Sequence, residues 1–184
     1  MRTVQDVANF MAEQPVLIGL LRAVATLPVN DCWIGAGVIR NAVWDCLHDR
    51  PVQIATGSDV DVIYFDHSNS SSERDLTIER QLAAAYAEVP WSVRNQARMH
   101  EQNGDAPYRD SEDAIRHWPE TATAVAARLQ DGRVQIIAPY GIDDLVQMIV
   151  RPTPGFRTKL AVYERRLASK NWARRWPRLT FILS

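Results

Sequence analysis

Hydrophobic residues recur at helical spacing near the start of the chain. Residues 3–14 and 16–27 each place apolar side chains three and four positions apart, which predicts two consecutive amphipathic helices. Pro15 stands between them, where its fixed φ angle suits the first turn of the second helix. A short strand at 32–35 is expected to lead directly into a third helix at about 36–48, which carries the same spacing.

The remainder of the chain alternates between strand and helix patterns. After a loop at 50–58, the β-branched and aromatic run 60–65 predicts a buried strand. The further elements expected are a helix at 73–88, a strand at 91–99, a helix opened by Ser111 at 111–118, a hairpin of 125–129 and 134–137 around Asp131–Gly132, a helix at 141–150 and a last helix at 156–173. This order predicts an α+β fold with a mixed β-sheet flanked by helices.

Composition and length fit one ordinary globular domain. The chain has 184 residues, 46% hydrophobic and 23% charged, with a net charge of -1. We expect a single domain over 1–184, with N-terminal helices at 1–28, a core at 29–150 and a basic helix at 151–184. No apolar run approaches the roughly 20 residues that cross a bilayer, so no membrane partner is expected. Cys32 and Cys46 have no disulfide or metal-ligand spacing, which indicates free thiols and a cytoplasmic location.

Positive charge gathers near the end of the chain. Between Arg151 and Arg178 there are nine Lys or Arg residues and one acid, Glu164. One interpretation is a basic patch for phosphates or RNA, and the other is a solvated helix face balanced by acids elsewhere. The tryptophans are interpreted mainly as core residues, with base stacking by Trp118 or Tyr140 as the alternative.

A turn of small residues precedes the third predicted helix. Gly35, Ala36 and Gly37 would let a ligand approach the backbone closely, and unpaired N–H groups at the helix start favour an anion such as a triphosphate. A glycine-rich turn before a helix is also often only a packing device, and this alternative stays open.

Two carboxylates begin the strand at 60–65. Because strand side chains alternate, Asp59 and Asp61 should point to one face, roughly 6.5 Å apart along the chain, and Val60 and Val62 to the core. Two acids on one face repel each other unless a cation lies between them, and Mg²⁺ commonly uses one or two carboxylates plus substrate phosphates. The alternative is a strand end with two solvated acids.

Together, the glycine-rich turn, the helix and the Asp-x-Asp strand resemble the nucleotidyltransferase superfamily typified by DNA polymerase beta and the tRNA CCA-adding enzymes. The resemblance sharpens to a bacterial nucleotidyltransferase-like family. It is carried by Ile34–Asn41, Ser58–Phe65, Trp91–His100, Trp118–Val125, Ala138–Leu145, Arg151–Pro154 and Lys170–Pro177.

The resemblance implies transfer of a nucleoside monophosphate from a nucleoside triphosphate to an acceptor hydroxyl. Asp59 and Asp61 would hold Mg²⁺ (or Mn²⁺) ions as the catalytic and metal-binding residues. The nucleotide would contact Gly35, Ala36, Gly37, Arg40, Ser58 and Asn95.

Catalytic members of the superfamily usually add a third carboxylate from a neighbouring strand. The expected neighbour, 91–99, offers Ser92, Arg94, Asn95 and Gln96 but no acid. Asn95 could ligate a metal through its carbonyl oxygen, but an amide cannot act as a general base. Glu120 is the alternative third ligand, against an N-cap or salt-bridge role.

Three functions therefore stay open: an active transferase, a nucleotide- or RNA-binding module that keeps the fold, and a structural partner of another protein. The acceptor also stays open between a small molecule, an RNA end and a protein side chain.

Overall fold

A five-stranded mixed sheet forms the centre of the computed structural model, which describes residues 1–54 and 59–183. The strands lie in the order β3-β2-β1-β4-β5, with β2 and β3 parallel and the other pairs antiparallel. Their bounds are β1 Trp33–Gly35, β2 Val60–Tyr64, β3 Trp91–Asn95, β4 Ala126–Gln130 and β5 Arg133–Ile137. The predicted α+β class with a mixed sheet is confirmed.

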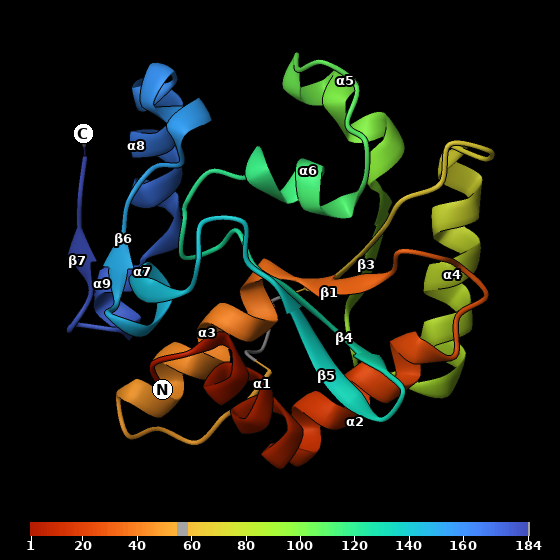
Figure 1. The fold of residues 1–184 in the computed structure, drawn as a ribbon, viewed down its shortest axis with the longest axis horizontal. Coiled ribbons are helices and arrows are strands. Elements are labelled where there is room, and N and C mark those ends of the chain that lie inside the picture. The colour runs from red at the N-terminus through yellow and green to blue at the C-terminus, as the bar shows by residue number, and fades with distance from the viewer. Residues whose placement is uncertain (55–58, 184) are drawn as a thin grey trace.

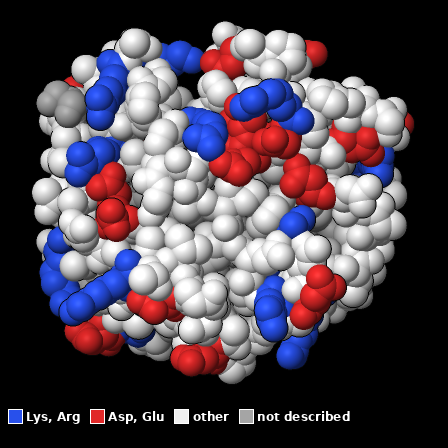
Figure 2. Space-filling view, viewed as in Figure 1, with Lys and Arg blue, Asp and Glu red and all other residues white. Residues whose placement is uncertain are grey.

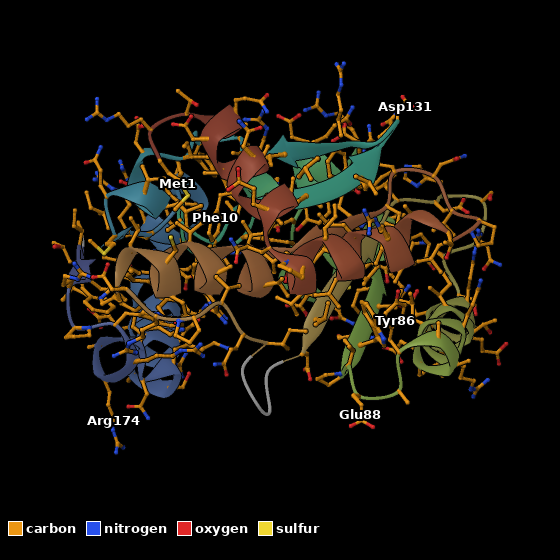
Figure 3. The ribbon with its side chains drawn as sticks, turned by 90° about the horizontal axis from the view of Figure 1, so that it is seen from below. Met1, Phe10, Tyr86, Glu88, Asp131 and Arg174 are labelled. Atoms are coloured by element: carbon orange, nitrogen blue, oxygen red, sulfur yellow. The ribbon has the colours of Figure 1, made fainter. Side chains whose placement is uncertain are left out.

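Four helices pack against one face of this sheet. They are α1 (Val4–Glu13), α2 (Pro15–Ala25), α3 (Ala36–Leu47) and α4 (Ser72–Ala85). The first contacts β5, the second β4, the third β2 and the fourth β3, so the whole width of the sheet is covered (Figures 1 and 3). A capping box at Thr3 starts α1, and Pro15 starts α2 as expected. Val60 and Val62 enter the main apolar core between these layers.

The other face of the sheet is covered less completely. The 3₁₀ helix η1 (Gln96–Arg98), α5 (Met99–Asn103) and α6 (Ser111–Arg116) lie on this side, opposite α1 to α3 (Figure 1). A small apolar cluster packs α6 against this face, formed by Trp33, Ile63, Ile115, Ala124 and Ala126. Space therefore remains on this face for polar side chains of β2.

The C-terminal segment folds back beside α3. It contains α7 (Asp143–Val146), β6 (Ile149–Val150), η2 (Pro154–Thr158), α8 (Leu160–Lys170), α9 (Trp172–Arg175) and β7 (Thr180–Phe181). Trp44 of α3 packs edge to face against Trp172 and Trp176, with ring centroids 5.7 and 5.2 Å apart. The indole N–H of Trp176 also donates to the buried Asp45 carboxylate at 2.8 Å. These contacts bring α8 next to the start of α3 (Figure 1).

Some predicted elements end earlier than expected. The strand expected at 91–99 stops at Asn95, because the Asn95 side chain accepts the Ala97 N–H and so starts a helical turn. Asp110, not Ser111, provides the N-cap of α6.

The C-terminal elements also differ from the prediction. The helix expected at 141–150 is confined to α7, because Ile149 and Val150 pair with β7. The last predicted helix is divided at Asn171, which has a φ of 51°.

The surface mixes both signs of charge. Lys and Arg are interspersed with Asp and Glu on the face seen in Figure 2. Five of the nine C-terminal basic residues form ion pairs with acids elsewhere in the chain: Arg151–Asp144, Lys159–Asp105, Arg166–Glu120, Arg175–Asp45 and Arg178–Asp49. Arg174 points away from the molecule (Figure 3). In the described part of the chain no single helix is long and apolar enough to cross a membrane, although α1 and α2, bent by 96°, reach that length and composition as a pair.

Candidate functional site

Alternation along β2 separates its acids from the core. Val60 and Val62 are fully buried under α3, whereas Asp61 shares its face with Ile63 and is half-buried. Asp59 precedes the strand and is exposed. The two carboxylates therefore lie on the less covered face of the sheet, as their spacing predicts.

The small residues before α3 have different tasks. A Cβ atom on Gly35 would lie 2.7 Å from Cη2 of Trp118, so the glycine is required by packing. The Ala36 N–H donates to Val125 O at 2.9 Å. Ala36 has a φ of 24°, a backbone conformation that residues other than glycine rarely adopt. At Gly37 no described atom lies within 4 Å of the Cβ position. The packing alternative thus explains Gly35, while Gly37 and Val38 present the first-turn N–H groups.

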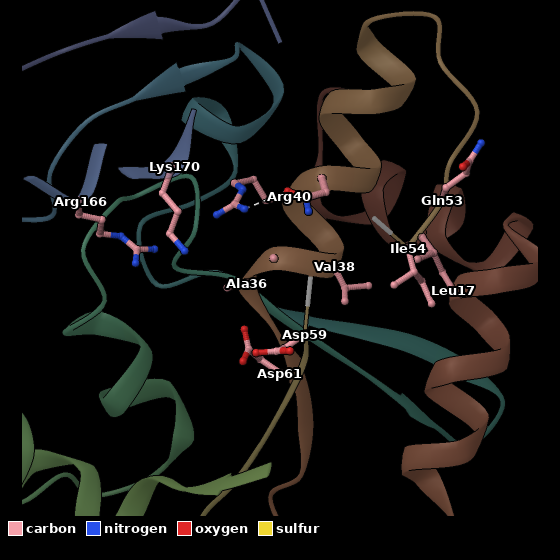
Figure 4. A pocket seen from close by; sticks show the side chains of 12 residues that line it. Leu17, Ala36, Val38, Arg40, Gln53, Ile54, Asp59, Asp61, Arg166 and Lys170 are labelled. Atoms are coloured by element: carbon pink, nitrogen blue, oxygen red, sulfur yellow. Dashed lines mark hydrogen bonds between the residues drawn. The ribbon is translucent and has the colours of Figure 1, made fainter. Parts of the chain in front are cut away.

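A pocket of about 330 Å³ brings this turn and the two acids together (Figure 4). Asp59 and Asp61 lie below Ala36 in this view, with the cationic side chains of Arg40, Arg166 and Lys170 on one side. The opposite side is mainly apolar and is lined by Leu17, Val38 and Ile54, together with the amide of Gln53. The pocket is thus divided into a cationic half and an apolar half, with the carboxylates between them.

Arg40 is the most enclosed of the three cations. Its side chain is 7% exposed, and its guanidinium lies 4.3 Å from the Trp172 ring centroid and 5.2 Å from that of Trp44. It donates to Asn41 Oδ1 at 2.9 Å, while its Nε is buried without a partner among the described residues. Burial lowers the pKa of Arg40 to about 10. Among the described residues the cation therefore has no carboxylate within ion-pair distance, and it is available to an anion in the pocket.

The charges of the pocket perturb one another. Burial, and then the nearby Asp59, raises the pKa of Asp61. Burial lowers the pKa of Lys170, and the positive charges of Arg166 and Arg40 lower it further. A ligand that carries both a divalent cation and a polyanion would relieve both repulsions.

Glu120 is committed to a structural ion pair. It is fully buried, its Oε1 accepts from Arg166 Nε at 2.6 Å, and its Oε2 accepts from the Thr123 hydroxyl. The salt-bridge alternative from the sequence is therefore the one the structure supports. Among residues 1–54 and 59–183, no group of three or more His, Cys, Asp or Glu side chains could hold a metal ion.

Asn95, expected to contact the nucleotide, is fully buried and lines neither of the two pockets that contain Asp61. It pairs with Tyr64 in the sheet, whereas the residue opposite Asp61 is Ser92. The Asn95 amide accepts from the N–H groups of Asp66 and Ala97, and donates to the carbonyls of Asp66 and Asn69. Its polar atoms thus hold the loop after β2. Ser58, also predicted to bind the nucleotide, lies outside the described residues.

A family model for nucleotidyltransferases matches residues 22–181. The chain belongs to this nucleotidyltransferase family. A solution NMR structure described as revealing a CCA-adding enzyme head domain is 34% identical, with a TM-score of 0.85 over 97% of this chain and 95% of that one. A search of curated proteins gives no match.

Larger enzymes share the fold at lower identity. The Thermotoga maritima CCA-adding enzyme in complex with tRNA is 13% identical, with a TM-score of 0.56 over 98% of this chain. A CCA-adding enzyme in complex with ATP is 14% identical, with a TM-score of 0.55 over 99%. The present chain spans 42% and 43% of those two chains, less than half of each. At these identities the likeness concerns the fold of the nucleotidyltransferase head.

Two cations of the pocket were not singled out from the sequence. Arg166 and Lys170 had been grouped with a basic C-terminal segment, but α8 places both beside the first turn of α3. Their spacing of four residues puts them on one helix face, which was the available signal. That this face meets α3 depends on the tryptophan contacts of Trp44, which no local pattern reveals.

Proposed function

We propose that this nucleotidyltransferase moves a nucleoside monophosphate from a nucleoside triphosphate to an acceptor hydroxyl, with Mg²⁺ (or Mn²⁺) bound by Asp59 and Asp61. One observation carries the proposal: a single pocket is lined by the first turn of α3, two carboxylates and three cations. These groups match the two charged components of a metal–triphosphate complex, since carboxylates attract the cation and the arginine and lysine side chains attract the phosphates.

The residues fit a hard divalent cation. Asp59 and Asp61 supply oxygen ligands from one face of β2, and their mutual repulsion contributes to the raised pKa of Asp61. Mg²⁺ usually keeps several waters and binds through one or two carboxylates and substrate phosphates, so two protein ligands suffice for binding. When bound, the ion would neutralise charge on the reacting phosphate.

The chain's own groups would orient the triphosphate for an in-line displacement. The acceptor oxygen forms a bond to the α-phosphorus, the bond from that phosphorus to the bridging oxygen breaks, and pyrophosphate leaves with both electrons. The acceptor proton passes to solvent. Lys170 and Arg166 would stabilise the negative charge that develops on pyrophosphate, and the N–H groups of Gly37 and Val38 would hold its oxygens.

The test is metal-dependent binding and transfer. In isothermal titration, ATP should bind the wild-type protein with Mg²⁺ or Mn²⁺ present and lose most of its affinity with EDTA. Asp59→Asn and Asp61→Asn should each abolish transfer of label from α-labelled ATP. Asp131→Asn, at the tip of the β4–β5 hairpin (Figure 3), is the matched control and should keep wild-type behaviour. Metal-independent binding, or no binding of any triphosphate, would contradict the proposal.

Serine at the position opposite Asp61 favours one second candidate, a nucleotide-binding module without transfer activity. A third carboxylate commonly serves as the base in such sites, and serine cannot replace it in that role. This candidate gives metal-dependent binding of ATP with no labelled product on any acceptor. Detection of labelled product on an RNA or small-molecule acceptor would exclude it.

A further inference from the structure

A second pocket, of about 290 Å³, adjoins the first at Asp61. The two share Ala36, Asp61 and Arg166 in their walls. Asp61 is therefore accessible from both sides, and a metal ion on its carboxylate would lie at the boundary. Two ligands placed in the two pockets would meet at that ion.

The walls of the second pocket differ in chemistry from those of the first. Trp118, Met99 and Phe156 give it an apolar surface, and Trp118 is only partly buried. Ser92 and Gln96 add neutral polar groups that can donate and accept hydrogen bonds. This combination of an aromatic ring with amide and hydroxyl groups suits a flat, polar ring system.

Charge in this pocket favours a neutral or anionic ligand. Arg94 and Arg166 line it, and Asp61 is the one acid among its described lining residues. Arg94 is exposed and pairs with Glu79 at 3.2 Å, a solvent-accessible contact that a ligand anion could replace. A metal ion on Asp61 would make the pocket more positive still, so a polycationic acceptor is disfavoured.

We propose that the second pocket is the acceptor site, and that the acceptor is a nucleotide-sized unit with a flat ring, an anionic group and a hydroxyl directed at Asp61. This inference rests on the proposed function. In-line displacement requires the acceptor oxygen opposite the leaving pyrophosphate. With pyrophosphate against Lys170, which lines only the first pocket, the free approach to Asp61 is from Ser92 and Trp118.

The volume limits what enters. About 290 Å³ lies just below the roughly 300–1,000 Å³ typical of ligand pockets, so one ring-bearing unit fits and a polymer does not. That unit could be a free mononucleotide or the last residue of an RNA chain. Both present the same ring, anion and hydroxyl to the pocket.

Nuclear magnetic resonance on the full chain tests the site. The ¹⁵N-labelled protein is first saturated with Mg²⁺ and α,β-methylene-ATP. One of three probes is then added: 5′-AMP, an RNA trinucleotide with a free 3′-hydroxyl, or kanamycin as the polycationic probe. AMP should shift the backbone N–H of Ser92 and Gln96 and the indole N–H of Trp118, and leave Leu17 and Gln53 unchanged. Tighter binding of the trinucleotide identifies the RNA end as the source, and equal or weaker binding identifies the mononucleotide.

A charge variant makes the test specific. Arg94→Gln should weaken AMP binding about tenfold and leave adenosine binding unchanged, since adenosine lacks the anion. Arg80→Gln, at an exposed position of α4, is the matched control and should change neither. Shifts confined to Leu17 and Gln53, stronger binding of kanamycin than AMP, or equal effects of the two variants would overturn the proposal. Failure of the ATP analogue to bind contradicts the proposed function itself, whereas binding of the analogue with no probe reaching this pocket contradicts the acceptor site alone.

Discussion

Asp61 of β2 and Ser92 of β3 lie directly opposite each other in the parallel pair of strands. Neighbouring strands are about 4.8 Å apart, so in-register side chains on the same face are close enough to share one ion. A carboxylate at position 92 would thus stand beside the Asp59–Asp61 pair. The hydroxyl that occupies this position is the feature that distinguishes this site from one with three acids.

Ser92→Asp should therefore complete a three-carboxylate metal site. We expect Mn²⁺ affinity, measured by isothermal titration, to rise about tenfold, and any transfer rate from ATP to rise with it. Ser92→Asn is the matched control, because it has the same shape without the charge. Equal affinities of the two variants would show that position 92 does not face the ion.

Asp61→Asn should make the metal-free protein more stable near neutral pH. Burial and Asp59 raise the Asp61 pKa in the folded state, so the folded state binds its proton more tightly than the unfolded state. Stability then falls as pH rises from the unfolded pKa of about 3.9 towards the raised folded pKa, and the loss is complete above it. The amide removes this loss, by an expected gain of about 1 kcal/mol or 2–4 °C in Tm at pH 7.

Calorimetry at two pH values checks the sign of this effect. The advantage of Asp61→Asn over wild type should vanish below about pH 3.9, where both states of the wild type are protonated. Added Mg²⁺ should raise the wild-type Tm and leave that of the variant unchanged. A variant less stable than wild type at pH 7 without metal would contradict the unfavourable burial of Asp61.

Alanine at the two glycines of the α3 turn should have opposite effects on stability. Gly37→Ala meets no described atom within 4 Å and adds helix propensity, so we expect unchanged stability or a gain of about 0.5 kcal/mol. Its methyl group would narrow the pocket and weaken ATP binding. Gly35→Ala would contact Trp118 and cost about 1–3 kcal/mol. Urea unfolding and ATP titration of both variants would separate these effects, and equal stability losses would contradict the distinction.

Glu120→Gln should loosen Arg166 at the junction of the two pockets. Removing one partner of a buried ion pair costs about 3–5 kcal/mol, and the partly exposed Arg166 reduces the expected loss to about 1–3 kcal/mol. ATP affinity should fall as well, because Arg166 would lose its orientation. Glu112→Gln, which breaks the exposed pair with Arg116, is the control and should stay within about 0.5 kcal/mol of wild type. A loss of stability without any change in ATP affinity would limit Glu120 to a structural role.

Local patterns predicted the parts of the fold that depend on local interactions. The helices before and after β1 follow from apolar spacing and from Pro15, and the alternation of Asp59, Val60 and Asp61 follows from strand geometry. The parallel register of β2 and β3 could not be read in the same way, because their connection passes through α4. The sequence therefore left Ser92, Arg94, Asn95 and Gln96 as candidates for the position beside Asp61, and the register selects Ser92.

The C-terminal contribution to the site was hidden for a similar reason. The pairing of β6 with β7 and the contacts of Trp44 join residues far apart in the chain, and neither has a local signature. These contacts decide that Arg166 and Lys170 face the pocket, while the ion pairs of Arg175 and Arg178 turn those side chains elsewhere.

The late position of Arg166 and Lys170 has a consequence during translation. The carboxylates, the α3 turn and the sheet are synthesised first, but two of the three pocket cations, Arg166 and Lys170, emerge from the ribosome after them. A nascent chain that has already formed its sheet would thus carry two unneutralised acids and little affinity for ATP. Under the proposed function, the contacts of Arg166 and Lys170 with the triphosphate would form only when α8 docks beside α3, so an incomplete polypeptide would bind the nucleotide more weakly than the folded protein.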